Sequence, residues 1–315
     1  MRKVATVFGG SGFIGSQVTQ RLARLDYVVR VITRNPDAVR AIATAGSTGQ
    51  IIPLVPDLAS EADITRAISG ADVVVNLIGI LQERRPGDFT RTHTELPGLI
   101  ARAARLAKVS RLTHISAIGA SPDSPSLYGR SKAGGEVLLR EHFPAAVILR
   151  PSLVFGPGDQ FFNRFAQLGR LLPFMPVVRG DTRLQPVYVG DVADAVIATL
   201  TRSDTPGRLY ELGGPRIAPF RDWLRMVLEV TGRRRRLIDL PEWLVSLQAR
   251  LGDHMANPPL TTDQLRMLSR DNVVSEGALT LADLGITPAA PEAITPVYLN
   301  RYRRPGPTDQ SLAHK

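Results

Sequence analysis

A tyrosine and a lysine in the segment YGRSK are the pair of residues in this sequence best suited to move a proton. Tyr128 and Lys132 are four positions apart, so they share one face if the segment is helical. An ammonium group beside a phenol lowers the pKa of the phenol, which can then exchange a proton with a neighbouring oxygen. The same spacing also fits an exposed pair with no chemical role. Because the chain has only six tyrosines and four lysines, we predict a catalytic pair.

A glycine-rich turn near the start of the chain, VFGGSGFIGS at residues 7–16, is suited to phosphate binding. Its glycines match both a three-residue spacing and the pattern GxGxxG. One glycine makes the tight turn, another lets the backbone approach a pyrophosphate, and the last lets the helix pack on the strand. The helix N-terminus then offers free N–H groups and a partial positive charge. We therefore predict a dinucleotide site that includes Gly9, Gly10, Ser11, Gly12, Phe13, Ile14 and Gly15.

The residues after the second apolar run indicate which dinucleotide is preferred. An NAD site usually has an acidic residue about 20 positions beyond the glycines, where it holds the ribose 2′-hydroxyl. This chain reads VITRNPD, with Thr33 and Arg34 where the acid would be. A guanidinium pairs well with a 2′-phosphate, so we predict NADP(H) in preference to NAD(H). The alternative is an Arg34 side chain directed to solvent.

Further candidates follow the later apolar runs. Asp57 and Leu58 come after the third run and are expected to flank the adenine. Asn76 and Gly79 come after the fourth and are expected to border the ribose and nicotinamide. Pro151, after the sixth, completes the predicted cofactor site.

Short β-branched apolar runs alternate with helical patterns through the first half of the chain. The predicted strands are Val4–Phe8, Val28–Ile32, Ile51–Val55, Val73–Ile78, Leu112–Ile115 and Val147–Leu149. The predicted helices are Gly12–Leu25, Pro36–Ala45, Glu61–Ser69, Asp88–Ala107 and Tyr128–His142. Strands buried on both faces and separated by helices indicate an α/β fold with a Rossmann-type, doubly wound parallel sheet. The carboxyl ends of its strands lie at one edge, where ligands bind.

The regular alternation ends near Pro151, where proline and glycine become frequent. We predict an NAD(P)-binding Rossmann domain over residues 1–150, to which 184–202 return, with Asp191 capping a helix. Residues 151–300 are expected to form a smaller, mostly helical, interleaved lobe. Its helices are predicted at Phe220–Thr231, Glu242–Leu251 and Thr262–Leu268, and 301–315 are expected to be a polar tail.

The composition excludes several classes of site and partner. The 315 residues include no cysteine, and the five histidines lack metal-ligand spacing, so we predict no metal site. No secretory signal and no apolar run near ~18 residues is present, which favours a cytoplasmic protein. The net charge of +10 comes from arginine, with only four lysines among 39 basic residues. This favours anionic partners or a merely solvated surface, and the lack of a recognition module argues against nucleic acid.

Two arginine-rich segments lie outside the predicted sheet. RRRR at 233–236 precedes a helical pattern whose apolar face comprises Trp243, Leu244, Leu247 and Leu251. That face fits docking on a membrane-bound partner or acidic lipid, and it also fits ordinary packing inside the protein. ERRPGD at 83–88 fits either contact with an acidic substrate or partner, or a solvated loop.

The glycine turn, the Tyr128/Lys132 pair and RPSLVFGPGD together resemble the extended short-chain dehydrogenase/reductase superfamily. VVVNLIGIL, THISAIGA, YGRSKAGGE and LQPVYVGDVADAV resemble its atypical, epimerase/dehydratase-like branch that contains the NADPH-binding accessory subunit of respiratory complex I. The resemblance covers roughly residues 3–230. It implies bound NADPH that Tyr128 and Lys132 contact at the ribose, and complex I subunits as partners at the cytoplasmic face of the inner membrane.

The sequence also departs from active members of that superfamily, which place a serine or threonine just after the strand-ending serine. Here Ser116 is followed by Ala117 and Ile118, so Ser116 is the remaining candidate to bind a substrate oxygen. His93 stands where many relatives have an asparagine, and we expect it to be buried and hydrogen-bonded. The resemblance therefore implies an accessory or assembly subunit with a largely structural cofactor.

Two alternatives to the accessory subunit remain. One is an active NADPH-dependent oxidoreductase or epimerase that acts on a small carbonyl or quinone-like substrate. The other is a redox sensor whose surface changes with the oxidation state of the nucleotide.

Overall fold

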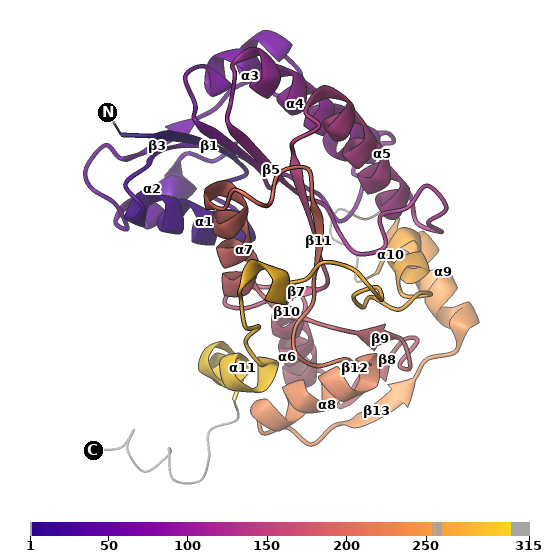
Figure 1. Cartoon of the computed structure of the whole chain (residues 1–315). Helices are drawn as coiled ribbons and strands as arrows, with labels where there is room; N and C mark the ends of the chain where they lie inside the picture. Colours follow the sequence, from indigo (N-terminus) through magenta and orange to yellow (C-terminus); the bar gives the residue numbers. More distant parts are fainter. Residues whose placement is uncertain (1, 254, 256–259, 304–315) are drawn as a thin grey trace, which may run out of the picture.

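A seven-stranded parallel sheet forms the centre of the protein (Figure 1). The computed structural model describes residues 2–253, 255 and 260–303. The strand order is β11-β6-β5-β4-β1-β2-β3, and every neighbouring pair is parallel. The strands are β1 (Val4–Phe8), β2 (Val28–Ile32), β3 (Ile51–Leu54), β4 (Val73–Asn76), β5 (Arg111–Ile115), β6 (Val147–Pro151) and β11 (Leu209–Leu212). The predicted α/β, Rossmann-type, doubly wound sheet is confirmed.

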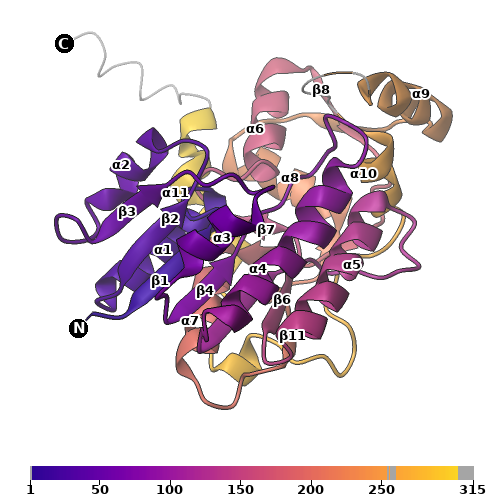
Figure 2. The same ribbon diagram turned by 90° about the horizontal axis from the view of Figure 1, so that it is seen from above.

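Helices cover both faces of this sheet (Figure 2). One face is covered by α1 (Phe13–Arg24), α2 (Asp37–Ala43) and α7 (Val189–Thr201), and the other by α3 (Glu61–Ile68), α4 (Leu96–Leu106) and α5 (Leu127–His142). Because successive residues of a strand point to opposite faces, Val73 and Val75 join one buried core while Val74 joins the other. The near-continuous apolar runs in the sequence reflect this burial on two sides.

The helix predicted over residues 88–107 has two parts. A π-helical turn over Thr90–Glu95 comes first, and the regular helix α4 follows it directly. Such π turns are rare and often lie at functional sites. The sequence pattern did not distinguish them.

The second lobe lies below the sheet in Figure 1 and is built from segments that alternate with returns to the sheet domain. Three two-stranded sheets pair β7 (Val154–Phe155) with β10 (Val187–Tyr188), β9 (Arg183–Leu184) with β12 (Ala218–Pro219), and β8 (Phe174–Val177) with β13 (Arg236–Asp239). Its helices are α6 (Phe162–Leu171), α8 (Phe220–Val230), α9 (Glu242–Gly252), α10 (Thr262–Met267) and α11 (Pro291–Leu299). Its core is rich in aromatic rings, with Phe155, Phe162 and Trp223 fully buried.

Two predictions about this part of the chain need correction. Asp191 does not cap α7, because the helix begins at Val189 and the Asp191 carboxylate accepts the Ala289 N–H at 2.8 Å. The tail predicted over 301–315 lies outside the described residues except for 301–303. Arg301 is not part of a loose tail, because its guanidinium donates to Asn163 Oδ1 at 2.5 Å.

None of the helices in the described part of the chain has the length and apolar character to cross a membrane.

Candidate functional site

The predicted site residues follow the strands in order along the carboxyl edge of the sheet. Asp57 and Leu58 come after β3, and Arg34 comes after β2. The glycine turn follows β1, at the centre of the row. The row continues on the other side of β1 with Asn76 and Gly79 after β4, Ser116 after β5, and Pro151 at the end of β6. Neighbouring strands are about 4.8 Å apart, so the row can accommodate an extended ligand that crosses several strands.

The glycine turn is packed so tightly that two of its residues, Gly10 and Gly15, have no room for a side chain. A Cβ atom at Gly15 would lie 2.0 Å from the Gly9 carbonyl oxygen and 2.7 Å from Gly10 Cα. A Cβ atom at Gly10 would lie 2.9 Å from Thr19 Oγ1 and 3.1 Å from Val31 Cγ1. Gly9 has a φ of 76°, a left-handed conformation that favours glycine. These contacts explain the glycine spacing, and they bring the start of α1 against the end of β1.

The N-terminus of α1 is free to bind an anion. Gly12 is the N-cap residue and no side chain caps the helix. The first turn also contains no acidic residue. The uncapped N–H groups and the partial positive charge of the helix therefore face the glycine turn without a competing carboxylate.

Of the two residues after β2, Thr33 is hydrogen-bonded to the glycine turn and Arg34 is exposed. Thr33 Oγ1 lies 2.7 Å from Ser11 Oγ and accepts the Asn35 N–H at 3.0 Å, so it fixes the glycine turn against the β2 end. Arg34 is exposed and has no hydrogen bond or ion pair within the described part of the chain. Its guanidinium is thus available beside the turn.

Asp57, after β3, forms a local turn through its own side chain. Asp57 is exposed, and its Oδ1 accepts the Ala59 N–H at 3.0 Å. Leu58 is half-buried against the core beneath α3. Both side chains stand at the outer end of the row, beyond β2.

Four buried polar atoms at the ends of β4 and β5 have no hydrogen-bond partner among the described residues. They are Asn76 Nδ2, both ring nitrogens of His114, and Ser116 Oγ. Asn76 and His114 are directly paired in the parallel register, and Ser116 lies two positions beyond on the same face. Burying polar atoms without partners costs free energy, so this cluster fits a site that a polar ligand or ordered water completes.

The sequence analysis missed His114, which lies inside the motif THISAIGA. It was passed over because a histidine in a buried strand gives no spacing signal. Burial, followed by the charge of Lys132, lowers the pKa of His114 to about 3. The ring is therefore neutral at physiological pH.

Two adjacent glycines in α5 allow this helix to lie against the π-helical turn. A Cβ atom at Gly135 would lie 1.8 Å from the His93 carbonyl oxygen, and one at Gly134 would lie 3.0 Å from Thr94 Cγ2. Thr94 Oγ1 also donates to the Ser131 carbonyl at 2.9 Å. The GG pair in YGRSKAGGE thus places α5 close enough for Lys132 to reach the sheet edge.

Lys132 is buried between the ends of β4 and β5. Its Nζ donates to the Ile115 carbonyl at 3.2 Å, and a Cβ atom built on Gly79 would lie 3.3 Å from the same nitrogen. Burial lowers the pKa of Lys132 from 10.5 to about 8, although the charge of Glu136 acts in the opposite direction. The structure therefore brings Lys132 next to Gly79 and to the residue before Ser116.

Tyr128 lies beside Lys132, in a cluster of rings. The Lys132 Nζ is 5.9 Å from the centre of its ring, and the His93 ring is 5.2 Å away in an edge-on arrangement. Burial raises the pKa of Tyr128 to about 12. The net shift is thus upward, opposite to the lowering expected from Lys132, because the structure removes the phenol from water.

The hydrogen bonds of His93 define its tautomer. Nε2 accepts the Ile80 N–H at 3.0 Å, and Nδ1 lies 3.0 Å from Ser131 Oγ, which itself donates to the Tyr128 carbonyl at 2.8 Å. The proton of His93 is therefore on Nδ1. Burial, followed by the charges of Lys132 and His114, lowers the His93 pKa to about 2. The prediction of a buried, hydrogen-bonded histidine is confirmed.

The loop FGPGD of the second lobe lies against the glycine turn. A Cβ atom on Gly158, which has a φ of 92°, would lie 3.9 Å from Phe13 Cδ2. The buried Asp159 carboxylate holds the loop by accepting the Gly156 N–H at 3.1 Å and the Tyr298 hydroxyl at 2.6 Å. The second lobe therefore contributes to the surroundings of the predicted pyrophosphate site.

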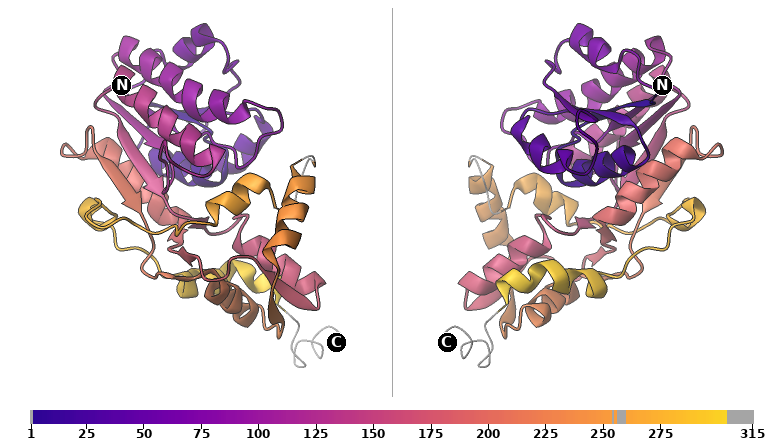
Figure 3. Two further views of the ribbon diagram at one scale, coloured as in Figure 1. Left: turned by 90° about the vertical axis from the view of Figure 1, so that its right-hand side faces the viewer. Right: turned by 90° about the vertical axis from the view of Figure 1, so that its left-hand side faces the viewer.

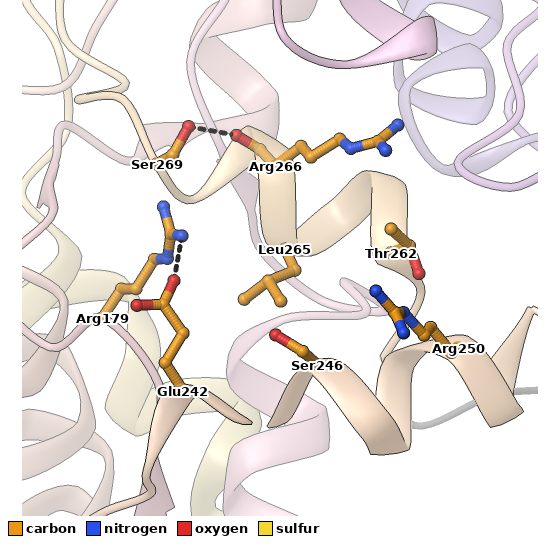
Figure 4. A pocket seen from close by; sticks show the side chains of 8 residues that line it. All are labelled: Arg179, Glu242, Ser246, Arg250, Thr262, Leu265, Arg266 and Ser269. Atoms are coloured by element: carbon orange, nitrogen blue, oxygen red, sulfur yellow. Dashed lines mark hydrogen bonds and ion pairs between the residues drawn. The ribbon is translucent and has the colours of Figure 1, made fainter. Parts of the chain in front are cut away.

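The apolar face predicted on α9 is exposed. Trp243 is 70% and Leu251 is 63% exposed, and Leu244 and Leu247 are exposed as well. The interpretation of this face as ordinary packing is wrong, since the buried side of α9 is formed by Val245, Ala249 and Gly252. Next to it, α9, α10 and Arg179 enclose a pocket of about 240 Å³ that no predicted site residue lines (Figure 4).

Two of the four arginines at 233–236 have structural partners. Arg233 donates to the Tyr302 carbonyl at 3.1 Å, and Arg235 donates to the Gly169 carbonyl at 3.1 Å. Arg234 and Arg236 are exposed. In the segment 83–88, Asp88 accepts the Arg84 and Arg85 N–H groups, which orders the loop and leaves both guanidiniums exposed.

Comparison with known proteins gives a family match over most of the sheet domain and part of the second lobe. The model of the NAD dependent epimerase/dehydratase family matches residues 5–213. A Dictyostelium discoideum protein named NADH dehydrogenase (ubiquinone) 1 alpha subcomplex subunit 9, mitochondrial, is 33% identical, with 99% of this chain and 88% of that protein covered.

A reductase and a nucleotide-bound enzyme are also similar. A Caulobacter vibrioides protein named ceramide reductase is 31% identical over 76% of this chain and 74% of its own. The Bordetella bronchiseptica enzyme WbmG, solved in complex with NAD, has a TM-score of 0.70 at 15% identity, with 96% of this chain and 94% of that chain covered.

Proposed function

This chain belongs to the NAD dependent epimerase/dehydratase family, and on that premise we propose that it binds NADP(H) as a largely structural cofactor in an accessory or assembly subunit of respiratory complex I. The glycine turn and the start of α1 would hold the pyrophosphate, Arg34 the 2′-phosphate, and Asp57 and Leu58 the adenine. Asn76, Gly79, Tyr128, Lys132 and Pro151 would surround the nicotinamide half.

One observation carries the nucleotide proposal: the glycine turn has no room for side chains at Gly10 and Gly15, and it opens onto a helix with no side-chain cap. A turn that served only to reverse the chain would not need both features. The orphaned polar atoms of Asn76 and Ser116 on the same edge support it independently. The residues present therefore fit a dinucleotide.

Arg34 is proposed to select NADP(H). We expect Arg34→Ala to weaken NADPH binding about tenfold or more, since a charge-assisted contact with phosphate is lost, and to leave NADH binding nearly unchanged. Titration calorimetry with both nucleotides measures this. Arg40→Ala is the matched control, because Arg40 is also exposed and close in sequence but pairs with Asp37 at 3.4 Å. Equal losses for NADPH and NADH, or no loss, would contradict the assignment of Arg34.

The accessory role is supported by the similarity to the NADH dehydrogenase (ubiquinone) subunit and by the exposed apolar face of α9. This exposed apolar face, with the exposed Arg250 beside it, fits an interface with another subunit at the cytoplasmic side of the inner membrane. It also fits contact with acidic lipid. Bound nucleotide would stabilise the protein by about 4 kcal/mol at a thousandfold excess over Kd. Occupancy would then be a condition of assembly.

Purification from the native host at low salt tests this function. We expect NADP(H) to be released on denaturation in about one equivalent, and respiratory-chain subunits to co-purify. Recovery of the protein without nucleotide and without those subunits would refute the proposal.

A second function is favoured by the retained Tyr128/Lys132 pair and by the similarity to a ceramide reductase. In this role the Tyr128 hydroxyl donates its proton to a substrate carbonyl oxygen, and Ser116 Oγ hydrogen-bonds the same oxygen. Lys132 holds the phenol and the ribose in place. A reduced nicotinamide supplies the hydride when it is bound.

Tyr128→Phe distinguishes the two functions. For a reductase, we expect NADPH consumption with a ketone or quinone substrate to fall 10²- to 10⁴-fold, the range for a lost general acid, with NADPH affinity little changed. For a structural cofactor, we expect no substrate-dependent NADPH consumption by either protein and unchanged co-purification of the respiratory subunits. The measurements are NADPH absorbance against a substrate panel and affinity purification from cells.

A further inference from the structure

Asp263 in the first turn of α10 extends from the second lobe to the helix that carries Tyr128. Its Oδ1 accepts the Leu127 N–H at 2.6 Å and its Oδ2 accepts the Tyr128 N–H at 3.0 Å. The α5 N-cap residue Ser126 accepts only the next N–H, that of Gly129, at 3.0 Å. Two of the first three donors of α5 therefore depend on a carboxylate that is more than 130 positions away in the sequence.

The same segment of the second lobe also holds the end of β6. Asn272 Oδ1 accepts the Ser152 hydroxyl at 2.6 Å and the Leu153 N–H at 3.1 Å, directly after Pro151. The stretch from Asp263 to Asn272 thus contacts the two elements that border the nicotinamide half of the row. No described contact of Asp263 or Asn272 involves the glycine turn.

Helices α9 and α10, here called the α9–α10 unit, share a small core of Val245, Ala249 and Leu265, and Val178, Leu240 and Leu260 pack against its edge. Figure 4 shows Leu265 directed from α10 toward α9, and Figure 3 shows α10 on the side of the pair nearer to α5. This core is smaller than the other three buried clusters. The unit can therefore shift at lower cost than the sheet domain, and Asp263 shifts with it.

We propose that Asp263 is a positioning residue through which the α9–α10 unit holds the first turn of α5, and with it Tyr128 and Lys132, in the arrangement that binds the nicotinamide half of the nucleotide. The proposal rests on the nucleotide binding proposed above. A carboxylate at a helix N-terminus favours the ordered first turn through both hydrogen bonds and the helix dipole. When the first turn is ordered in only a fraction of molecules, the apparent Kd rises by the inverse of that fraction.

The test compares a whole nucleotide with a fragment. We expect Asp263→Ala to weaken NADPH binding about fivefold, the typical cost of losing a helix cap, and to leave the Kd of adenosine 2′,5′-bisphosphate unchanged. That fragment has no nicotinamide half, so it measures only the proposed adenosine half of the site: the glycine turn, Arg34, and the adenine contacts of Asp57 and Leu58. Asp263→Asn retains one acceptor oxygen and should restore part of the NADPH affinity.

Asp271→Ala is the matched control. Asp271 lies in the same segment and also accepts two hydrogen bonds, from Arg183 N at 2.8 Å and Arg183 Nε at 2.7 Å, but both partners belong to the second lobe. We expect it to lower the melting temperature without changing either Kd. Hydrogen exchange at the Leu127 and Tyr128 amides should accelerate in Asp263→Ala and not in Asp271→Ala.

The outcomes separate this inference from the function on which it rests. If the unmodified protein binds neither ligand, the nucleotide proposal fails. If it binds both and Asp263→Ala retains the NADPH affinity, or loses affinity for both ligands equally, Asp263 has no positioning role.

Discussion

Gly15→Ala is expected to weaken nucleotide binding about 100-fold and to destabilise the protein. The added Cβ would lie 2.0 Å from the Gly9 carbonyl oxygen and 2.7 Å from Gly10 Cα, and neither backbone atom can move without opening the turn. Overpacking of this kind costs about 1–3 kcal/mol, which outweighs the roughly 1 kcal/mol that alanine contributes over glycine within a helix. If the free energy of forming the turn that binds nucleotide rises by about 3 kcal/mol, NADPH affinity falls about 100-fold.

Calorimetric titration and thermal unfolding measure the two parts of this prediction. We expect the melting temperature of Gly15→Ala to fall by about 5 °C. Gly12→Ala is the folding control, because a Cβ at Gly12 would approach only the Gly9 carbonyl oxygen, at 3.3 Å, and its melting temperature should stay near that of the unmodified protein. Tight NADPH binding by Gly15→Ala would show that the turn is not the pyrophosphate site.

Lys132 is expected to make both stability and nucleotide affinity depend on pH above 8. Burial lowers its pKa from 10.5 to about 8, so the folded protein loses this proton before the unfolded chain does. Between those pH values the unfolded state binds more protons, and stability therefore rises with pH across that window. At 1.36 kcal/mol per pKa unit, the burial of the ammonium costs about 3 kcal/mol at neutral pH.

Nucleotide affinity should follow the opposite course. In the proposed complex the ammonium would donate hydrogen bonds to the ribose, and the neutral amine would lack its charge, so NADPH affinity should fall about tenfold per pH unit above about 8. We expect Lys132→Met to weaken NADPH binding at pH 7, to remove both pH dependences, and to raise the stability of the nucleotide-free protein.

Urea unfolding and NADPH titration from pH 7 to pH 10.5 test these expectations. Tyr128→Phe is the matched control on the same helix. The pKa of Tyr128 is 10.0 in the unfolded chain and about 12 in the folded protein, so the control should keep both slopes up to about pH 9.5, below the range where Tyr128 itself titrates. A flat stability profile in the unmodified protein would show that Lys132 titrates in its ordinary range.

Local pattern was sufficient for six of the seven strands of the sheet; β11, which joins it from beyond the predicted sheet domain, was not predicted. The strands from β1 to β6 are short apolar runs, and all but the edge strand β3 are largely buried. The glycine pattern was recognised from its spacing, although the structure shows that Gly9 and Gly10 also pack against the distant Ile78 and Val31. The Tyr128/Lys132 pair was found because helical spacing puts its members together irrespective of what surrounds them. The exposed face of α9 was recognised as apolar, but the pattern could not show whether another element covered it.

By itself, the sequence determined the doubly wound sheet, the glycine turn and the placement of most candidate residues at strand ends, because these depend on the periodicity and size of neighbouring side chains. Only the tertiary structure decided the direction of the Tyr128 pKa shift, the unpartnered state of His114, and the bonds from Asp263 to the start of α5. Burial and long-range hydrogen bonds depend on which surfaces meet after folding. A local sequence pattern cannot show that two residues more than 130 positions apart are in contact.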